Sequence, residues 1–218
     1  MKKICILSDF DGTITEKDAL YFFFKQYAKP EWLEVEKQWT EGKIDSKECL
    51  KQEFALVPDL TKGIIDKYLD TVTIDKYFKS FYEILQEKNI DLYIVSDGVD
   101  YFIERILKNN GIKNLKIISN HGEIQNNQLK LTFPNTSSEC LNGAGTCKCA
   151  IVRKMKKEYE KVVYIGDGMS DFCVADKADK LFAKNGLAEH CKTKGINHVE
   201  YADFKGVIAN DMFRKYDF

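Results

Sequence analysis

The chain is poor in the residues and runs that mark unusual protein classes. Its 218 residues include 3 Pro and 13 Gly, too few for a collagen-like or low-complexity chain. The 33 Lys and Arg nearly balance the 34 Asp and Glu, which gives no basis for binding nucleic acid or an anionic membrane surface. No apolar run, Ala19–Phe24 included, approaches the roughly 18 to 20 residues of a membrane span. A hydrophobic fraction of 44% predicts a globular protein with a real core.

Cysteine is present in an odd number and in scattered positions. The seven Cys lie in apolar segments and one loop, which does not suit a disulfide framework. The apolar stretch at the start of the chain ends at Asp9, short of a secretory signal, so we expect a cytoplasmic protein. Zinc at Cys140, Cys147 and Cys149 is an alternative, but C-x6-C-x-C lacks the usual paired spacing and a fourth ligand is not evident.

Short apolar runs alternate with helical patterns along much of the chain. The runs are continuous, as expected of strands buried on both faces, and the patterns between them repeat apolar residues every three or four positions. Strands are expected at Ile4–Leu7, Leu92–Val95, Leu115–Ile118, Val162–Ile165 and Lys180–Ala183, and helices at Tyr77–Lys88, Tyr101–Lys108 and Cys149–Tyr159. This order predicts a doubly wound, Rossmann-like parallel α/β sheet, with ligands at the carboxyl ends of the strands.

Two segments interrupt the alternation. Residues 18–72 are too long for one crossover and are rich in aromatic and helical patterning, so we expect three or four short helices inserted over the edge of the sheet. Residues 123–131 read as two short strands about an Asn-Asn turn, which predicts a hairpin. The expected division is an α/β core of residues 1–16 and 73–218 and a small helical cap of residues 17–72.

The first expected strand leads directly into Asp9-Phe10-Asp11-Gly12-Thr13. Two acids two residues apart, followed by a Gly that lets the backbone turn, place both carboxylates at the ligand end of the sheet. One can act as a nucleophile while the other manages a proton. The alternative is an ordinary turn, since Asp and Gly are common turn residues.

Polar groups also follow the strands that we expect beside the first one. Ser96, Asp97 and Gly98 offer a hydroxyl and backbone N–H groups for an oxyanion, or simply a cap and a turn. Asp167 and Asp171 add two acids, which repel the first pair unless a cation such as Mg²⁺ lies between them. Ser170 and Asp171 could equally cap a helix.

A site with four acids that handles an anionic substrate also needs a positive side chain. Lys148 starts the expected helix that leads to Asp167 and Asp171, so its ammonium can face substrate oxygens and pair with Asp171. A Lys at a helix start is usually only solvated, so the argument for Lys148 depends on the whole constellation.

The ordered set Asp-Phe-Asp-Gly-Thr, Val-Ser-Asp-Gly, a lone Lys and Gly-Asp-Gly-Met-Ser-Asp resembles the haloacid dehalogenase superfamily of phosphatases. The resemblance implies that Asp9 is the nucleophile that becomes an aspartyl phosphate, and that Asp11 is the general acid and base. It implies a phosphate cradle of Ser96 and the backbone at Asp97 and Gly98, and a charge-neutralising Lys148. It also assigns Thr13 to the support of this phosphate-binding loop.

The same resemblance implies a Mg²⁺ cofactor. The ion is expected on Asp9, on the backbone carbonyl of Asp11 and on Asp167, with Asp171 helping from the outer shell. Metal and Lys together offset the repulsion that arises when a carboxylate attacks a phosphoryl group.

The helical insert is similar to the cap of the phosphoserine-phosphatase-like branch, in which Asp18 falls where an acidic residue can face a substrate amine. That branch also uses a cap Arg on the substrate carboxylate, but this sequence has no Arg before Arg105. The sequence more closely resembles the 2-hydroxy-3-keto-5-methylthiopentenyl-1-phosphate phosphatases of methionine salvage in three places. These are the string from Asp11 to Asp18, the Leu131-Thr132-Phe133-Pro134 turn and the Cys-rich loop. The aromatic residues of the cap suit a thioether tail, or form the cap's own core.

The expected activity is therefore hydrolysis of a small phosphorylated metabolite. The alternatives are a phosphoserine phosphatase, a phosphotransferase that passes the phosphoryl group to another alcohol, and a binding module on a retired phosphatase fold. The sequence does not indicate an oligomeric state.

Overall fold

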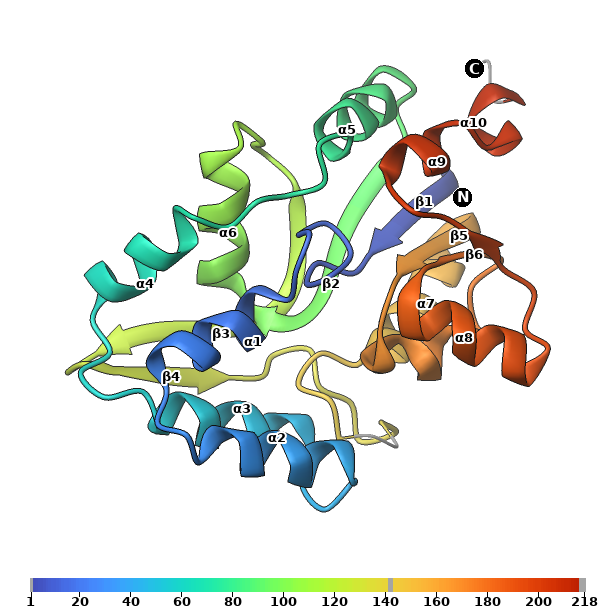
Figure 1. The fold of residues 1–218 in the computed structure, drawn as a ribbon. Helices are drawn as coiled ribbons and strands as arrows, with labels where there is room; N and C mark the ends of the chain where they lie inside the picture. The colour runs from blue at the N-terminus through green and yellow to red at the C-terminus, as the bar shows by residue number, and fades with distance from the viewer. Residues whose placement is uncertain (1, 141–142, 216–218) are drawn as a thin grey trace.

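The computed structural model describes residues 2–140 and 143–215, which fold around a central sheet (Figure 1). Its strands are β1 (Lys2–Ser8), β2 (Asp91–Val99), β3 (Lys116–Gln125), β4 (Gln128–Thr132), β5 (Tyr159–Gly166), β6 (Lys180–Ala183) and β7 (Val199–Glu200). Their order is β4-β3-β2-β1-β5-β6-β7, parallel throughout except for the antiparallel pair β3 and β4. Because β1 is central, its carboxyl end lies between those of β2 and β5.

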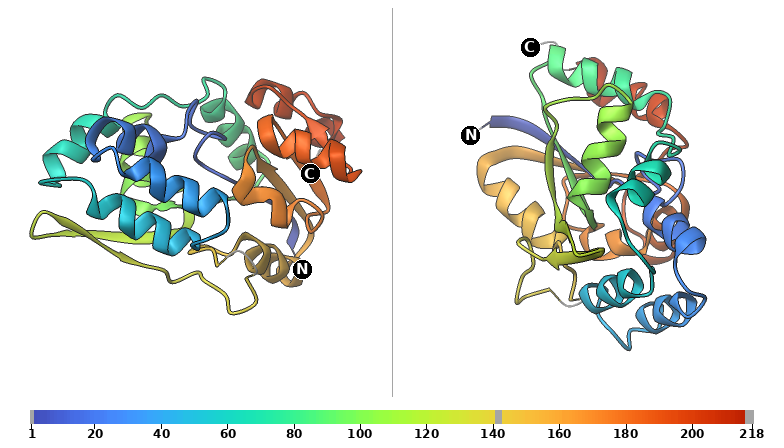
Figure 2. Two further views of the ribbon diagram at one scale, coloured as in Figure 1. Left: turned by 60° about the horizontal axis from the view of Figure 1, so that its bottom comes forward. Right: turned by 90° about the vertical axis from the view of Figure 1, so that its left-hand side faces the viewer.

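Helices cover both faces of the sheet (Figure 2). They are α1 (Ala19–Tyr27), α2 (Trp32–Thr40), α3 (Ser46–Ala55), α4 (Lys62–Leu69), α5 (Phe78–Glu87), α6 (Asp100–Asn109), α7 (Lys148–Glu158), α8 (Asn185–Lys194), α9 (Phe204–Ile208), α10 (Asp211–Lys215) and the 3₁₀ helix η1 (Met169–Val174). Among these described helices, none combines the length and apolar character that a membrane crossing requires. The doubly wound α/β architecture expected from the alternating pattern is confirmed.

Burial on both faces explains why the strands read as continuous apolar runs. Ile4 and Ile6 of β1 belong to one core cluster, which includes residues of α5, α6 and α9. Cys5 and Leu7 belong to a second cluster, which includes residues of α7 and α8. Successive side chains of a strand point to opposite faces, so a strand covered on both sides has no polar position to alternate with.

Four helices, α1 to α4, lie between β1 and α5. Three of them begin at a residue whose side chain accepts a backbone N–H of the first turn: Asp18, Asp45 and Thr61. The helix α3 packs against α2 and β4, whereas α4 packs against α6. The chain leaves the sheet and returns to it at one place, where Thr15 pairs with Ile74. We propose that residues 17–72 form a cap on a core of residues 1–16 and 73–218, and we use "cap" for this segment below.

The strand expected at Leu115–Ile118 and the first arm of the expected hairpin are one element. The strand β3 pairs in parallel with β2 up to Asn120 and antiparallel with β4 from His121 onward. The expected turn is confirmed, because Asn126 and Asn127 have φ values of 50° and 58°, as a tight hairpin turn requires. The expectation of two separate elements is wrong because one strand changes its partner midway.

Candidate active site

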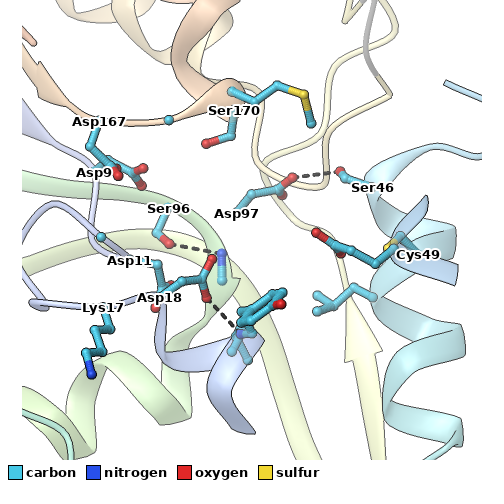
Figure 3. A pocket seen from close by; sticks show the side chains of 18 of the residues that line it. Asp9, Asp11, Lys17, Asp18, Ser46, Cys49, Ser96, Asp97, Asp167 and Ser170 are labelled. Carbon is cyan, nitrogen blue, oxygen red and sulfur yellow. Dashed lines mark hydrogen bonds between the residues drawn. The ribbon is translucent and has the colours of Figure 1, made fainter. Parts of the chain in front are cut away.

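The two acids after β1 lie at the floor of a cavity between the core and the cap (Figure 3). Asp9 is 5% exposed, and its backbone N–H donates to the carbonyl of Ile165 in the neighbouring strand at 2.9 Å. Its Oδ1 accepts the N–H of Phe10 at 2.8 Å, and its Oδ2 lies 3.0 Å from Nζ of Lys148. The carboxylate of Asp9 is therefore held in one orientation by two donors.

Lys148 lies behind the Asp9 carboxylate and supplies the positive charge beneath the floor. It is 2% exposed, and its Nζ contacts Asp9 and also donates to Oδ1 of Asp171 at 2.6 Å and to Oγ of Ser170 at 2.8 Å. Burial alone would lower the pKa of Lys148, but the carboxylates of Asp171 and Asp9 together outweigh it and raise that pKa above its ordinary value. The two neighbouring carboxylates therefore favour the charged form of Lys148.

Asp171 is fully buried, and both of its oxygens accept hydrogen bonds. Oδ1 accepts from Lys148 and from the hydroxyl of Tyr164, the latter at 2.6 Å. Oδ2 accepts the backbone N–H groups of Asp167 and Gly168 at 3.0 and 3.3 Å. Asp171 therefore fixes Lys148 and the turn that carries Asp167.

Asp167 stands beside Asp9 at the cavity floor (Figure 3). Its Oδ1 accepts the hydroxyl of the fully buried Thr13 at 2.9 Å, so Thr13 orients Asp167. Gly12 has a φ of +70°, and a Cβ there would lie 2.5 Å from Oδ2 of Asp167, so the turn requires glycine.

The floor carboxylates fit a hard divalent cation. Ligand atoms of Asp9, Asp167 and Asp171 all lie within 4.8 Å of one another. The pKa of Asp9 is raised well above its ordinary value, first by burial and then by the neighbouring Asp171, although Lys148 opposes this. Burial and Asp171 likewise raise the pKa of Asp167. One Lys does not neutralise this cluster, and oxygen ligands are those that Mg²⁺ prefers.

Asp11 connects the floor to the cap. Its Oδ1 accepts the N–H of Ala19, the first residue of α1, at 2.9 Å. Burial, and next the charge of Asp18, raise the pKa of Asp11 to about 8, so this carboxyl can hold a proton at neutral pH. A Cβ at Gly98 would lie 2.9 Å from Oδ2 of Asp11, so glycine at this position leaves room for the acid.

The Ser96-Asp97-Gly98 segment belongs to β2, at a place where its pairing with β3 is irregular. The hydroxyl of Ser96 accepts the N–H of Gly98 at 2.9 Å, and both residues line the cavity. The side chain of Asp97 is held from other sides: it accepts from the hydroxyl of Ser46 at 2.6 Å, from the N–H of Thr146 at 2.8 Å and from the amide of Asn120 at 3.1 Å. Asp97 therefore ties the start of α3 to the core.

The cavity above the floor has a volume of about 360 Å³. Its wall includes Asp18, whose carboxylate caps α1 by accepting the N–H of Tyr21 at 2.8 Å, as well as residues of α2 and α3. Lys17 is the sole basic residue among the described residues that line it, and in Figure 3 its side chain points away from Asp9 and Asp167.

Several residues of the site were not expected from the sequence. Tyr164 lies two positions before Gly166 in β5, so the two residues share one face of the strand. This spacing was the available signal that Tyr164 belongs to the site. Glu36, Cys49 and Glu53 line the cap side of the cavity, and a Glu within the buried face of an amphipathic helix was the signal for Glu53.

The structure also bears on two alternative interpretations of the sequence, a helix cap at Ser170 and a zinc site in the Cys-rich loop. Ser170 as a helix cap is wrong, because η1 starts after Gly168 and the Ser170 hydroxyl accepts from Lys148 instead. Zinc at the Cys-rich loop gains no support: in residues 2–140 and 143–215, the grouped donors are Asp9, Asp167, Asp171 and Glu36, Cys49, Glu53.

Two acids after β1, a Lys at the start of α7 and two further acids after β5 are the arrangement expected of haloacid dehalogenase-type phosphatases, and comparisons with solved structures agree on the fold. A HAD family hydrolase from Salmonella enterica serovar Typhi matches with a TM-score of 0.75 at 18% identity, covering 99% of this chain and 72% of that one. A phospho-aspartyl intermediate analogue of phosphoserine phosphatase matches with a TM-score of 0.70 at 22% identity, covering 95% and 98% of the two chains.

Sequence comparisons identify the family more closely. The family model described as "Putative Phosphatase" matches residues 4–192, and the chain belongs to this family. It is similar to the 2-hydroxy-3-keto-5-methylthiopentenyl-1-phosphate phosphatase of Geobacillus kaustophilus, with 34% identity over 95% of this chain and 94% of the relative. The enzyme of the same name from Brevibacillus brevis is also 34% identical, over the same shares. The expected phosphatase class is thereby confirmed.

Proposed function

We propose that this phosphatase hydrolyses a small phosphomonoester through an aspartyl phosphate on Asp9. The observation that carries the proposal is the fixed position of Asp9 at the cavity floor, next to Lys148 and beside Asp167. A phosphoryl group above Asp9 would meet the Ser96 hydroxyl, which lines the cavity, and the positive charge of Lys148 behind the Asp9 carboxylate. Positioning and charge neutralisation supply most of the catalysis of phosphoryl transfer.

In the first step, Oδ2 of Asp9 forms a bond to phosphorus as the bond to the leaving oxygen breaks. Asp11 gives its proton to that oxygen, and the alcohol departs. In the second step, water attacks the phosphorus while Asp11 takes a proton from it, which releases phosphate and regenerates Asp9. The cap excludes bulk water during the first step.

Mg²⁺ is the proposed cofactor. Asp9, Asp167 and the carbonyl of Asp11 would hold it. Asp171 would act from the outer shell because it is fully buried and, unlike Asp9 and Asp167, is not among the described residues that line the cavity. When bound, the ion offsets the negative charge of the carboxylates and the phosphoryl oxygens.

The proposed substrate is the one in the names of the curated relatives, 2-hydroxy-3-keto-5-methylthiopentenyl-1-phosphate. The apolar residues Phe24, Trp39 and Leu50 in the cavity wall suit a thioether tail. Phosphoserine is the weaker candidate, because the described residues of the cavity wall contain no Arg for its carboxylate.

The test is phosphate release from a panel of phosphomonoesters, with the chelated protein before and after addition of Mg²⁺. We expect no turnover without the metal and at least a hundredfold preference for the enol phosphate over phosphoserine, about 2.7 kcal/mol of transition-state binding. Full turnover in the chelated protein would refute the mechanism, and a preference for phosphoserine would refute the substrate. With a competing alcohol present, a phosphorylated alcohol instead of free phosphate would identify a phosphotransferase.

A further inference from the structure

Two cysteine side chains meet where the helix α7 packs against η1. The thiol of Cys149, the second residue of α7, donates to the backbone carbonyl of Cys173 in η1 at 2.9 Å. The two thiols also form a hydrogen bond with each other. Neither residue is among the described residues that line the catalytic cavity, so the proposed hydrolysis does not use this pair.

The pair is more accessible than most cysteines of the chain. All seven cysteines are free, and four of them are buried: Cys5, Cys49, Cys147 and Cys191. Cys149 and Cys173 are only half-buried, and Cys173 lines a second cavity of about 620 Å³ beside Cys140. A small oxidant can therefore reach these two sulfur atoms from solvent.

The surroundings of Cys149 favour its thiolate. The hydrogen bond from the Cys173 thiol lowers the pKa of Cys149 below its ordinary value, although burial opposes this. Cys149 also lies in the first turn of α7, where the free backbone N–H groups favour a negative charge. By contrast, burial raises the pKa of Cys5 to about 12. Because the thiolate is the form that reacts with peroxides, Cys149 is the more reactive of these two residues.

The same two elements carry the charged contacts beneath the catalytic floor. Lys148 immediately precedes Cys149 in α7, and its ammonium contacts Ser170 and Asp171 of η1 at 2.8 and 2.6 Å. A disulfide brings its sulfur atoms much closer together than two thiols in contact. Bonding Cys149 to Cys173 would therefore shift the start of α7 relative to η1, and this shift would change the contacts of Lys148.

We propose that Cys149 and Cys173 are a site of reversible oxidation by a hydroperoxide, and that their disulfide lowers the phosphatase activity. The sulfur of Cys149 attacks the O–O bond of the peroxide, which forms a sulfenic acid and releases an alcohol or water. The sulfur of Cys173 then attacks the sulfenic sulfur, which forms the S–S bond and releases water. Two thiols are thus oxidised while one peroxide is reduced, and an added dithiol restores both thiols by exchange.

The first experiment identifies the bond. The full chain is treated with hydrogen peroxide, blocked with iodoacetamide and digested with trypsin, which cleaves after Lys148 and so separates Cys147 from Cys149. We expect mass spectrometry to find a linked pair of peptides, residues 149–153 and 162–177, which dithiothreitol resolves into its two parts. Absence of this pair from protein that has consumed peroxide would overturn the proposal.

The second experiment measures activity, on the phosphomonoester of the panel above that the reduced protein hydrolyses fastest. We expect kcat to fall at least about fivefold after peroxide treatment, because Lys148 is displaced, and to recover with dithiothreitol. Full activity of the disulfide-linked protein would overturn the proposed effect. So would a loss that dithiothreitol does not reverse, since it would assign the effect to oxidation of Met169, which is 39% exposed.

The matched variants are Cys149→Ser and Cys173→Ser, with Cys140→Ser, another half-buried position, as the control. We expect each of the first two to keep its kcat after peroxide treatment and to give no linked peptides, whereas Cys140→Ser should respond as the wild type does. Two variants keep the test open if one does not fold. Equal loss of activity in all three variants would overturn the proposal, as would resistance confined to Cys140→Ser.

Discussion

Two groups of buried acids face the same cavity and differ in what surrounds them. At the floor, both oxygens of Asp171 accept hydrogen bonds, and Lys148 joins Asp171 to Asp9. On the cap wall, Glu36 and Glu53 have each other and a thiol, and Glu53 keeps its proton. The comparison teaches that two buried groups of acids around one cavity can have very different hydrogen-bond donors and cations as neighbours. The floor acids Asp9 and Asp171 contact the Lys148 ammonium, whereas no ion pair between described residues includes Glu36 or Glu53.

Removing the nucleophile from the floor gives the largest expected effect. Asp9→Asn retains one oxygen, which can keep the bond from either Phe10 or Lys148 but not both, and it cannot form an aspartyl phosphate. We expect phosphate release to fall by at least about 10⁴-fold, with a thermal midpoint close to that of the wild type. Substantial turnover in a folded Asp9→Asn protein would exclude Asp9 as the nucleophile.

Removing the cation would make the floor resemble the wall. Lys148→Met leaves Asp9 and Asp171 facing each other without a positive charge, so we expect a loss of about 3–5 kcal/mol in the free energy of unfolding, measured in urea. Lys154→Met, at an exposed position of the same helix, is the control and should change stability by less than about 0.5 kcal/mol. Equal stabilities of the two variants would show that Lys148 does not balance the floor acids.

Breaking the hydrogen bond that ties α3 of the cap to Asp97 of the core should lower stability less than Lys148→Met does. Ser46→Ala removes the hydrogen bond from the start of α3 to Asp97, while Thr146 and Asn120 still donate to that carboxylate. We expect a stability loss of about 1–2 kcal/mol and a higher KM with little change in kcat. Ser80→Ala, exposed on α5, is the control. A change in kcat alone would assign Ser46 to the chemical step.

The smallest expected effect is a change in the pH dependence of stability, caused by the proton on Glu53. The pKa of Glu53 is about 9 in the folded protein and 4.5 ordinarily, so the stability this proton contributes is full below pH 4.5 and declines as the pH rises toward 9. Glu53→Gln needs no such proton. We expect this variant to gain at least about 1 kcal/mol relative to the wild type between pH 5 and pH 8, about 2–4 °C in Tm. Parallel Tm curves for the two proteins would contradict the raised pKa.

The sequence predicts the floor better than the wall, for a physical reason. Asp9 and Asp167 each follow an apolar run that ends at the same sheet edge, so strand order alone brings them together. Glu36 and Glu53 lie on different helices, and their meeting depends on how α2 packs on α3, which no local pattern encodes. The change of partner in β3 was missed for a similar reason, because β4 continues the sheet where the apolar run has ended.

The bond from Ala19 to Asp11 has a consequence for the timing of catalysis. Asp11, the proposed proton donor, is held by the first backbone N–H of the cap helix α1. Any outward movement of α1 removes that bond, so the acid is oriented for the leaving group when the cap is docked. If the cap opens to admit substrate, we expect delivery of the proton to follow only after it has closed, because α1 would take part in both events.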